Sequence, residues 1–338
     1  MKKTILITGS SGFLGSAFIR MCGNIYYTIG IDIADPNPFL NANPDKFCNC
    51  NIITEPEKLY DIICETNPDA VIHLAAVSTV DEGYNNPSKT WLTNSLGTQN
   101  ILIILDKYQQ SVGRKIPLII SSTDKVMEEQ PFGIPYSGRT RILPAFRSTY
   151  DCAKSIEELL CQSYAGEGNP VVILRQCNIV GQGDMNFTRI VPQVCKKLYH
   201  HETINIRCFR SQNGGIDEFY RTFMAVEDLV NIYTIVTEDL MNNPESSHSG
   251  IYCVAPSRDN SMSVTNLVKR IADHYGAGDT MRLEYSVVGT GYEIKSQFID
   301  PSDFNNRYRY TPSIGIDRML ENTVAWYKEY FAQTESAD

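Results

Sequence analysis

The sequence lacks the features that mark several large classes of protein. It has no Cys-X-X-Cys pair, and no histidine or further cysteine lies near Cys48 and Cys50 at the spacing of a zinc site. It has no window of about 18 apolar residues, so we expect no transmembrane helix. Internal repeats and low-complexity tracts are absent as well. The chain therefore reads as a globular protein without a metal site.

Positive charge is also scarce, with 30 lysines and arginines against 39 acidic residues and a formal net charge of −9. This balance disfavours nucleic acid and anionic membranes as partners. An anionic ligand must then be met by local arginines, helix ends or backbone amides. The ten cysteines are scattered along the chain, which is typical of reduced thiols in a cytoplasmic protein.

The first half of the chain alternates short apolar runs with helical patterns. We expect strands at residues 4–9, 26–32, 70–76, 117–123 and 170–176, and helices at 13–22, 55–67, 93–110 and 149–168. Near-continuous apolar strands that alternate with helices indicate a parallel sheet covered on both faces. With right-handed crossovers this gives an α/β, doubly wound parallel sheet of the Rossmann type over residues 1–180.

The pattern loosens after residue 180. Helices are expected at 188–200, 226–241, 263–275 and 316–331, with short strands at 222–228 and 250–255. We therefore predict a smaller, mostly helical C-terminal domain over residues 181–338 that receives a substrate. Within it, the segment from about 222 to 255 is expected to return to the first sheet.

The stretch ITGSSGFLGS places Gly9, Gly12 and Gly15 between a strand and a helix. One glycine permits the tight turn, one lets a pyrophosphate approach the backbone, and one lets the helix pack on the sheet. The N-terminus of the helix would then face the phosphates. Because the spacing is G-x-x-G-x-x-G, a glycine-rich turn without a ligand is the alternative.

Asp32 closes the second expected strand. A carboxylate there can accept both ribose hydroxyls and repel a 2′-phosphate, which favours NAD over NADP; a turn aspartate is the alternative. His73 is expected to be structural. The residues predicted to contact the dinucleotide are Gly9, Ser11, Gly12, Phe13, Leu14, Gly15, Asp32, Ile33, Asn51, Ile52, Leu74, Ala75, Ala76, Asn94, Ser121, Tyr150 and Lys154.

Tyr150 and Lys154 lie one helical turn apart in TYDCAKS and share a helix face. An ammonium and a positive nicotinamide ring beside the phenol would lower the pKa of Tyr150 toward working pH. Thr123 ends the ISST strand and would share a hydrogen bond with Tyr150 and a substrate hydroxyl. Ordinary polarity of a surface helix is the alternative.

Together these motifs resemble an extended short-chain dehydrogenase/reductase of the nucleotide-sugar type. They are the three glycines, Asp32, HLAA at 73–76, Asn94, Thr123, and the Tyr150/Lys154 pair, and the likeness continues in RTFMAVEDLV (221–230) and RYRYTPSIGIDRMLENTVAWY (307–327). The resemblance covers nearly the whole chain. It implies NAD, a nucleotide-diphosphate sugar substrate, and a homodimer formed through the helices at 93–110 and 149–165.

Within that family, Asp124 and Lys125 after Thr123 resemble the 4,6-dehydratases. RQCNIVGQGDMNFTRIVP (175–192) is most similar to the members that act on CDP-glucose. The resemblance implies Asp124 as acid and Lys125 as base. Since consecutive strand residues point to opposite faces, the strand must end by Thr123 for both to reach one sugar. A solvent-exposed turn with a weak ion pair is the alternative.

Two other functions remain open, a 4-epimerase or related nucleotide-sugar oxidoreductase, and a non-catalytic NAD-binding protein. Met127 and Glu128 stand where the family commonly has Tyr-Gly, which leaves the sugar open. For the substrate we favour Arg221, whose planar fork fits a diphosphate. The full set of predicted substrate contacts is Asn178, Arg189, Arg207, Arg221 and Arg309, although each arginine alone also fits an ordinary surface position.

Overall fold

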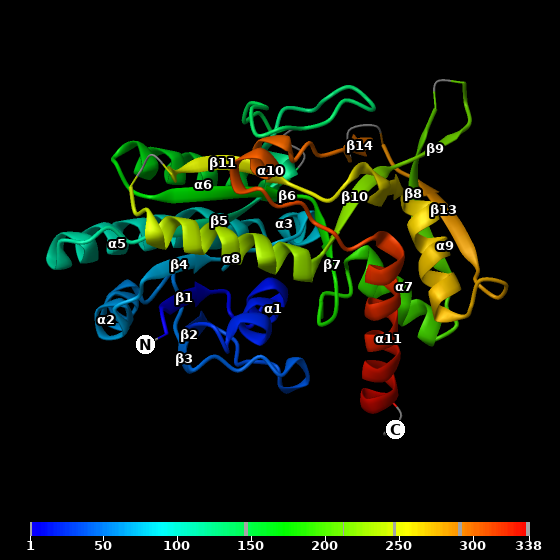
Figure 1. Cartoon of the computed structure of the whole chain (residues 1–338). Helices are drawn as coiled ribbons and strands as arrows, with labels where there is room; N and C mark the ends of the chain where they lie inside the picture. The colour runs from blue at the N-terminus through cyan, green and yellow to red at the C-terminus, as the bar shows by residue number, and fades with distance from the viewer. Residues whose placement is uncertain (1, 145–147, 212, 246–247, 290–292, 336–338) are drawn as a thin grey trace.

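Seven parallel strands form the central sheet (Figure 1), in the order β11-β6-β5-β4-β1-β2-β3. The computed structural model describes residues 2–144, 148–211, 213–245, 248–289 and 293–335. The strands are β1 (Thr4–Thr8), β2 (Tyr27–Asp32), β3 (Lys46–Asn49), β4 (Ala70–His73), β5 (Leu118–Thr123), β6 (Val171–Gln176) and β11 (Gly250–Val254). The order reverses at β1, between β2 and β4, which confirms the doubly wound sheet.

Helices cover both faces of this sheet because successive strand residues are buried on opposite sides. Ile5 and Ile7 of β1 pack in one core with α1 (Phe13–Cys22) and α8 (Val226–Asn242). Leu6 between them packs in a second core with the helices of the other face. Those helices are α2 (Pro56–Thr66), α5 (Thr98–Val112) and α6 (Thr149–Gly166).

The segment after β4 holds more helix than we predicted. Two short helices, α3 (Val80–Asn85) and α4 (Pro87–Trp91), precede a π-helical turn over Leu92–Gly97 that runs into α5. The extra turns pack against α6. Gly83 in α3 permits this approach, because an added Cβ would lie 2.9 Å from the Cβ of Tyr150.

The C-terminal part carries its own core between α7 (Ile190–Tyr199), α9 (Val264–Tyr275) and α11 (Ile316–Thr334). In Figure 1 these helices stand apart from the central sheet, and α10 (Ser302–Tyr308) lies near β11. Two small sheets accompany them. One holds β7 (Asn178–Val180), β10 (Tyr220–Ala225), β12 (Ser261–Ser263) and β14 (Ser296–Gln297); the other holds β8 (Ile204–Arg210), β9 (Ile216–Glu218) and β13 (Leu283–Val287).

The two strands expected between residues 222 and 255 have different partners. β11 joins the edge of the central sheet beside β6, and α8 before it packs against α1. β10 instead pairs with β7, β12 and β14 in the second sheet. Within the described ranges, no helix is both long and apolar enough to cross a bilayer.

Candidate active site

A large cavity opens at the carboxyl ends of β1, β4, β5 and β6 and extends to the C-terminal part. Its volume is about 1310 Å³, more than the roughly 300–1,000 Å³ of an ordinary ligand pocket. The predicted site residues that line it are Gly9, Ser11, Gly12, Phe13, Leu14, Gly15, Asp32, Ile33, Asn51, Ile52, Leu74, Ala75, Ala76, Ser121, Thr123, Asp124, Lys125, Tyr150, Lys154, Asn178, Arg189, Arg207 and Arg221.

The glycine loop after β1 leaves a cradle that side chains would fill. Gly9 has a left-handed φ of 69°, and a Cβ there would lie 2.7 Å from the backbone nitrogen of Ala75. A Cβ at Gly15 would lie 2.7 Å from the Cα of Ser10. Gly12 is the N-cap of α1, whose N-terminus borders the cavity. These are the features that a dinucleotide pyrophosphate requires.

Asp32 is fixed at the end of β2 by the backbone around it. One carboxylate oxygen accepts from the Ser11 amide at 3.0 Å, and the other accepts from the amides of Ile33 and Ala34 at 2.7 and 3.1 Å. A carboxylate has further lone pairs to accept the hydroxyls of a ribose. The arrangement therefore fits NAD at this edge of the cavity.

Two predicted site residues do not line the cavity. Asn94 is fully buried, and its amide group donates to the Val77 carbonyl at 2.9 Å and accepts from the Val77 amide at 2.8 Å. It therefore fixes the segment after β4 instead of facing the cavity. Arg309 is exposed and follows α10 with a left-handed φ of 53°, outside the cavity lining.

Thr123 and Tyr150 meet inside the cavity. Tyr150 lies in the first turn of α6, which Ser148 caps by accepting from the Asp151 amide at 3.3 Å. Burial raises the pKa of Tyr150 well above its usual value, a hydrogen bond with Thr123 opposes this, and the charge of Glu157 adds to it. The pKa is raised because the phenol is desolvated and faces carboxylates. The lower pKa expected beside a positive nicotinamide ring concerns the cofactor-bound protein and stays a prediction.

Lys154 is held by Glu157, a residue that we had not predicted to belong to the site. Its ammonium donates to the Ser121 carbonyl at 2.9 Å and to both Glu157 carboxylate oxygens at 2.9 Å. The two side chains are 4% and 2% exposed. Burial raises the pKa of Glu157 to about 7, although the Lys154 charge opposes the rise. The signal was available, since Glu157 follows Lys154 by one helical turn.

Asp124 and Lys125 both line the cavity although they are consecutive. β5 ends at Thr123 and a 3₁₀ turn over Asp124–Val126 follows, so the alternation of strand side chains no longer applies. Asp124 is 5% exposed and accepts from the Thr123 hydroxyl at 3.2 Å. Burial raises the pKa of its carboxyl, against the charges of Lys125 and Arg221. An exposed turn is therefore excluded for Asp124.

Two of the predicted arginines meet at a carboxylate that we had not predicted. Glu293 accepts from Arg221 and from Arg207, each at 2.9 Å. Arg207 also pairs with Asp81 of α3 at 3.3 Å, which links the C-terminal part to the first half of the chain. Burial alone would raise the pKa of Glu293. The charges of Arg221 and Arg207 outweigh burial, so the pKa is lowered.

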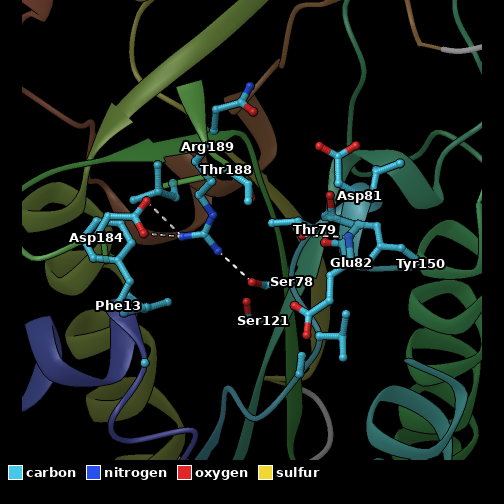
Figure 2. A pocket seen from close by; sticks show the side chains of 18 of the residues that line it. Phe13, Ser78, Thr79, Asp81, Glu82, Ser121, Tyr150, Asp184, Thr188 and Arg189 are labelled. Atoms are coloured by element: carbon cyan, nitrogen blue, oxygen red, sulfur yellow. Dashed lines mark hydrogen bonds and ion pairs between the residues drawn. The ribbon is translucent and has the colours of Figure 1, made fainter. Parts of the chain in front are cut away.

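Arg189 crosses the cavity, as Figure 2 shows. It donates to both carboxylate oxygens of Asp184 at 3.0 Å and to the Ser78 hydroxyl at 2.7 Å. Asn178 borders the same space and donates to the Thr222 carbonyl at 3.2 Å. No group of three or more His, Cys, Asp or Glu side chains that could hold a metal ion occurs among the residues that the structure describes.

Known proteins resemble this chain over its full length. CDP-glucose 4,6-dehydratase of Salmonella typhimurium is 22% identical, over 97% of this chain and 91% of its own. UDP-glucose 4-epimerase of Mycoplasma pneumoniae is also 22% identical, over 98% of both chains. The crystal structure of dTDP-glucose 4,6-dehydratase from Bacillus anthracis in complex with NAD superposes with a TM-score of 0.80 and 19% identity, over 99% of this chain and 100% of that one. The sequence profile described as the NAD dependent epimerase/dehydratase family matches residues 5–255, and the chain belongs to that family.

Proposed function

We propose that this NAD-dependent enzyme is a nucleotide-sugar 4,6-dehydratase, which converts its substrate to a 4-keto-6-deoxy sugar. The observation that carries the proposal is the end of β5 at Thr123, which turns both Asp124 and Lys125 into the cavity beside Tyr150. Oxidation at carbon 4 needs only the tyrosine, the lysine and the cofactor. A further acid and base are needed for loss of water.

Each catalytic side chain has one role in the proposed reaction. The glycine loop and Asp32 would hold NAD, which would supply a hydride acceptor for carbon 4 and a hydride donor for carbon 6. Tyr150 takes the proton of the 4-hydroxyl. The Thr123 hydroxyl orients the Tyr150 phenol and the 4-hydroxyl of the sugar. The ketone at carbon 4 acidifies carbon 5, where Lys125 removes the proton. Asp124 protonates the 6-hydroxyl, which leaves as water. Carbon 5 takes a proton back from Lys125, after exchange with solvent, when the hydride is delivered to carbon 6.

The burial of Asp124 suits this division, because it favours the protonated carboxyl that an acid requires. Lys125 is half-buried in the cavity lining, and its charge acts on Glu293, which pairs with Arg221. Asp124 and Lys125 exchange a proton between their resting and working states, so they act as one coupled pair.

The substrate diphosphate is proposed to bind Arg221, Arg207 and Arg189, with Asn178 beside them. Arginine forks match phosphate oxygens and exchange one acceptor for another without losing their charge. Glu293 would then share its two arginines with the phosphates. Arg309 is not included, since it lies outside the cavity lining.

A 4-epimerase, or another nucleotide-sugar oxidoreductase of the family, is the second candidate. Its support is the equal identity to the epimerase of Mycoplasma pneumoniae. The discriminating experiment incubates the enzyme with CDP-glucose, dTDP-glucose and GDP-mannose in heavy water. We expect one of them to yield a 4-keto-6-deoxy sugar with deuterium at carbon 5. A C-4 epimer formed without loss of water would contradict the dehydratase, and no turnover of a bound sugar nucleotide would favour a non-catalytic protein.

We further propose that the enzyme is a cytoplasmic homodimer. All ten cysteines are free thiols, which favours a reducing compartment. The outer faces of the neighbouring helices α5 and α6 expose Ile103, Ile156 and Leu159 at 57%, 39% and 53%. Large exposed apolar side chains on two neighbouring helices fit a protein interface.

The substitution Ile103→Glu is expected to weaken the dimer about tenfold or more, because it places an unpaired charge in a desolvated contact. Sedimentation velocity over a dilution series measures this. Ile25→Glu is the matched control, since Ile25 is 50% exposed but lies before β2, away from both helices. A monomeric wild-type chain, or equal effects of the two substitutions, would contradict the proposed interface.

A further inference from the structure

Every donor of the Lys154 ammonium is engaged within the protein. A lysine ammonium has three N–H donors, and Lys154 makes three hydrogen bonds, one to the Ser121 carbonyl and two to the Glu157 carboxylate. A cofactor ribose that contacts Lys154 must therefore replace one of these acceptors. The bidentate contact with Glu157 is the one that can be given up, since a single oxygen still holds the pair.

The neighbouring carboxylate, Glu158, has a different partner. It is fully buried and accepts from the Arg175 guanidinium at 2.7 Å and from the Ser122 hydroxyl at 2.8 Å. Its charge is balanced by Arg175. The charge of Lys154 is thus balanced by Glu157. The two buried ion pairs have different hydrogen-bond partners, although the Glu158 charge contributes to the raised pKa of Glu157.

The pairing lies on the same face of α6 as Tyr150, which is one helical turn before Lys154. A free ammonium beside the phenol would stabilise the phenolate, whereas an ammonium paired with a carboxylate does so much less. Apart from burial, the carboxylates of Glu157, Asp124 and Asp151 are the groups that raise the pKa of Tyr150, with Glu157 the largest of the three.

We propose that Glu157 is a positioning residue that keeps Tyr150 protonated by neutralising Lys154, and that it yields one of its two contacts with Lys154 when a cofactor ribose binds. Ribose binding then draws the ammonium partly away from Glu157 and favours the phenolate only once the cofactor is in place. This inference rests on the proposed redox role of Tyr150 and Lys154.

Other charged or titratable groups surround the three residues and are not altered by a substitution at Glu157. They come from the strands and helices packed against this end of α6. They are His73 of β4, Asp124 after β5, Asp151, Glu158 and Cys161 of α6, Arg175 of β6, and Tyr233 of α8.

Glu157→Gln is the direct test, since it removes the charge and keeps the shape. The titration of Tyr150 is followed by ultraviolet difference absorption of the phenolate, as the difference between each protein and the same protein carrying Tyr150→Phe. We expect the titration without cofactor to shift by about one pH unit or more to lower pH. We also expect NAD to shift the wild-type titration further than that of the variant.

Glu158→Gln is the matched control, with the same change at the adjacent and equally buried position. It is expected to lower stability but to leave the Tyr150 titration unchanged. Should Glu157→Gln fail to fold, Glu157→Asp retracts the carboxylate and is expected to shift the titration in the same direction by less. No shift with Glu157 variants, or equal shifts at the two positions, overturns the inference.

The titration needs no turnover, so it separates this inference from the dehydratase proposal. If Glu157→Gln shifts the titration while no sugar nucleotide is dehydrated, the positioning role stands and the proposed function falls. If dehydration is observed and the titration does not move, the reverse holds.

Discussion

Replacing Lys125 with methionine is expected to lower formation of the 4-keto-6-deoxy sugar by about 10²–10⁴-fold while cofactor affinity stays unchanged. Methionine fills nearly the same volume but cannot accept the carbon 5 proton. Lys125 follows the end of β5 and makes no contact with the glycine loop that the structure records, so the cofactor cradle is left intact. Oxidation at carbon 4 depends on Tyr150 and is expected to continue.

Three measurements separate these effects. NAD binding is measured by calorimetry, single-turnover oxidation by the absorbance of the reduced cofactor, and carbon 5 chemistry by deuterium uptake from the solvent. Lys58→Met is the control, because Lys58 is an exposed residue of α2 paired with Glu55. Asp124→Asn is expected to slow water loss as well, but to leave deuterium uptake at carbon 5 in place. Undiminished dehydration by Lys125→Met would show that the pair after β5 is not catalytic.

Arg175→Met is expected to lower the free energy of unfolding by about 3–5 kcal/mol. Arg175 is 2% exposed, and its removal leaves the fully buried Glu158 without its cation. The substitution also removes the hydrogen bond that Arg175 donates to the Thr140 carbonyl at 2.8 Å. Urea unfolding followed by circular dichroism measures the loss.

The double variant Arg175→Met/Glu158→Met tests whether the unpaired buried charge causes the loss of stability. Replacing both ions by apolar side chains of similar volume removes the uncompensated charge, so we expect it to regain most of the lost stability. A double variant as unstable as the single one would mean that packing and the Thr140 contact, not the buried charge, account for the effect.

Much of the sheet was predictable because its strands are buried on both faces. Ile5, Leu6 and Ile7 are all fully buried, so the sequence of β1 reads as a continuous apolar run. We missed strands that lack a continuous run of buried residues. β3 (Lys46–Asn49) has only partly buried or exposed residues. β8 (Ile204–Arg210) does alternate buried and exposed residues at its start, but its parallel partner β13 follows far along the chain.

The residues of the candidate site also fall into those that the sequence predicts and those that it does not. The glycine loop, Asp32 and the turn at Asp124 follow from local sequence, because each lies where a strand ends. Asn94 fits a family motif, yet its side chain turns into the protein interior toward Val77. Glu293 was missed because its importance depends on which cations it meets after folding. Glu157 could have been found, because it lies one helical turn after Lys154. The direction of the Tyr150 pKa depends on burial, which no motif records.

The position of β11 has a consequence for folding. The chain leaves the central sheet after β6, builds β7 to β10 and α7, and then returns through α8 to add the seventh strand. Val226, Leu229 and Val230 of α8 lie in the same core as Ile5 and Ile7 of β1. A fragment ending near residue 180 would keep the cofactor cradle but expose that core. A boundary near residue 180 therefore does not separate two units of folding, and the sheet is completed only after most of the chain has been synthesised.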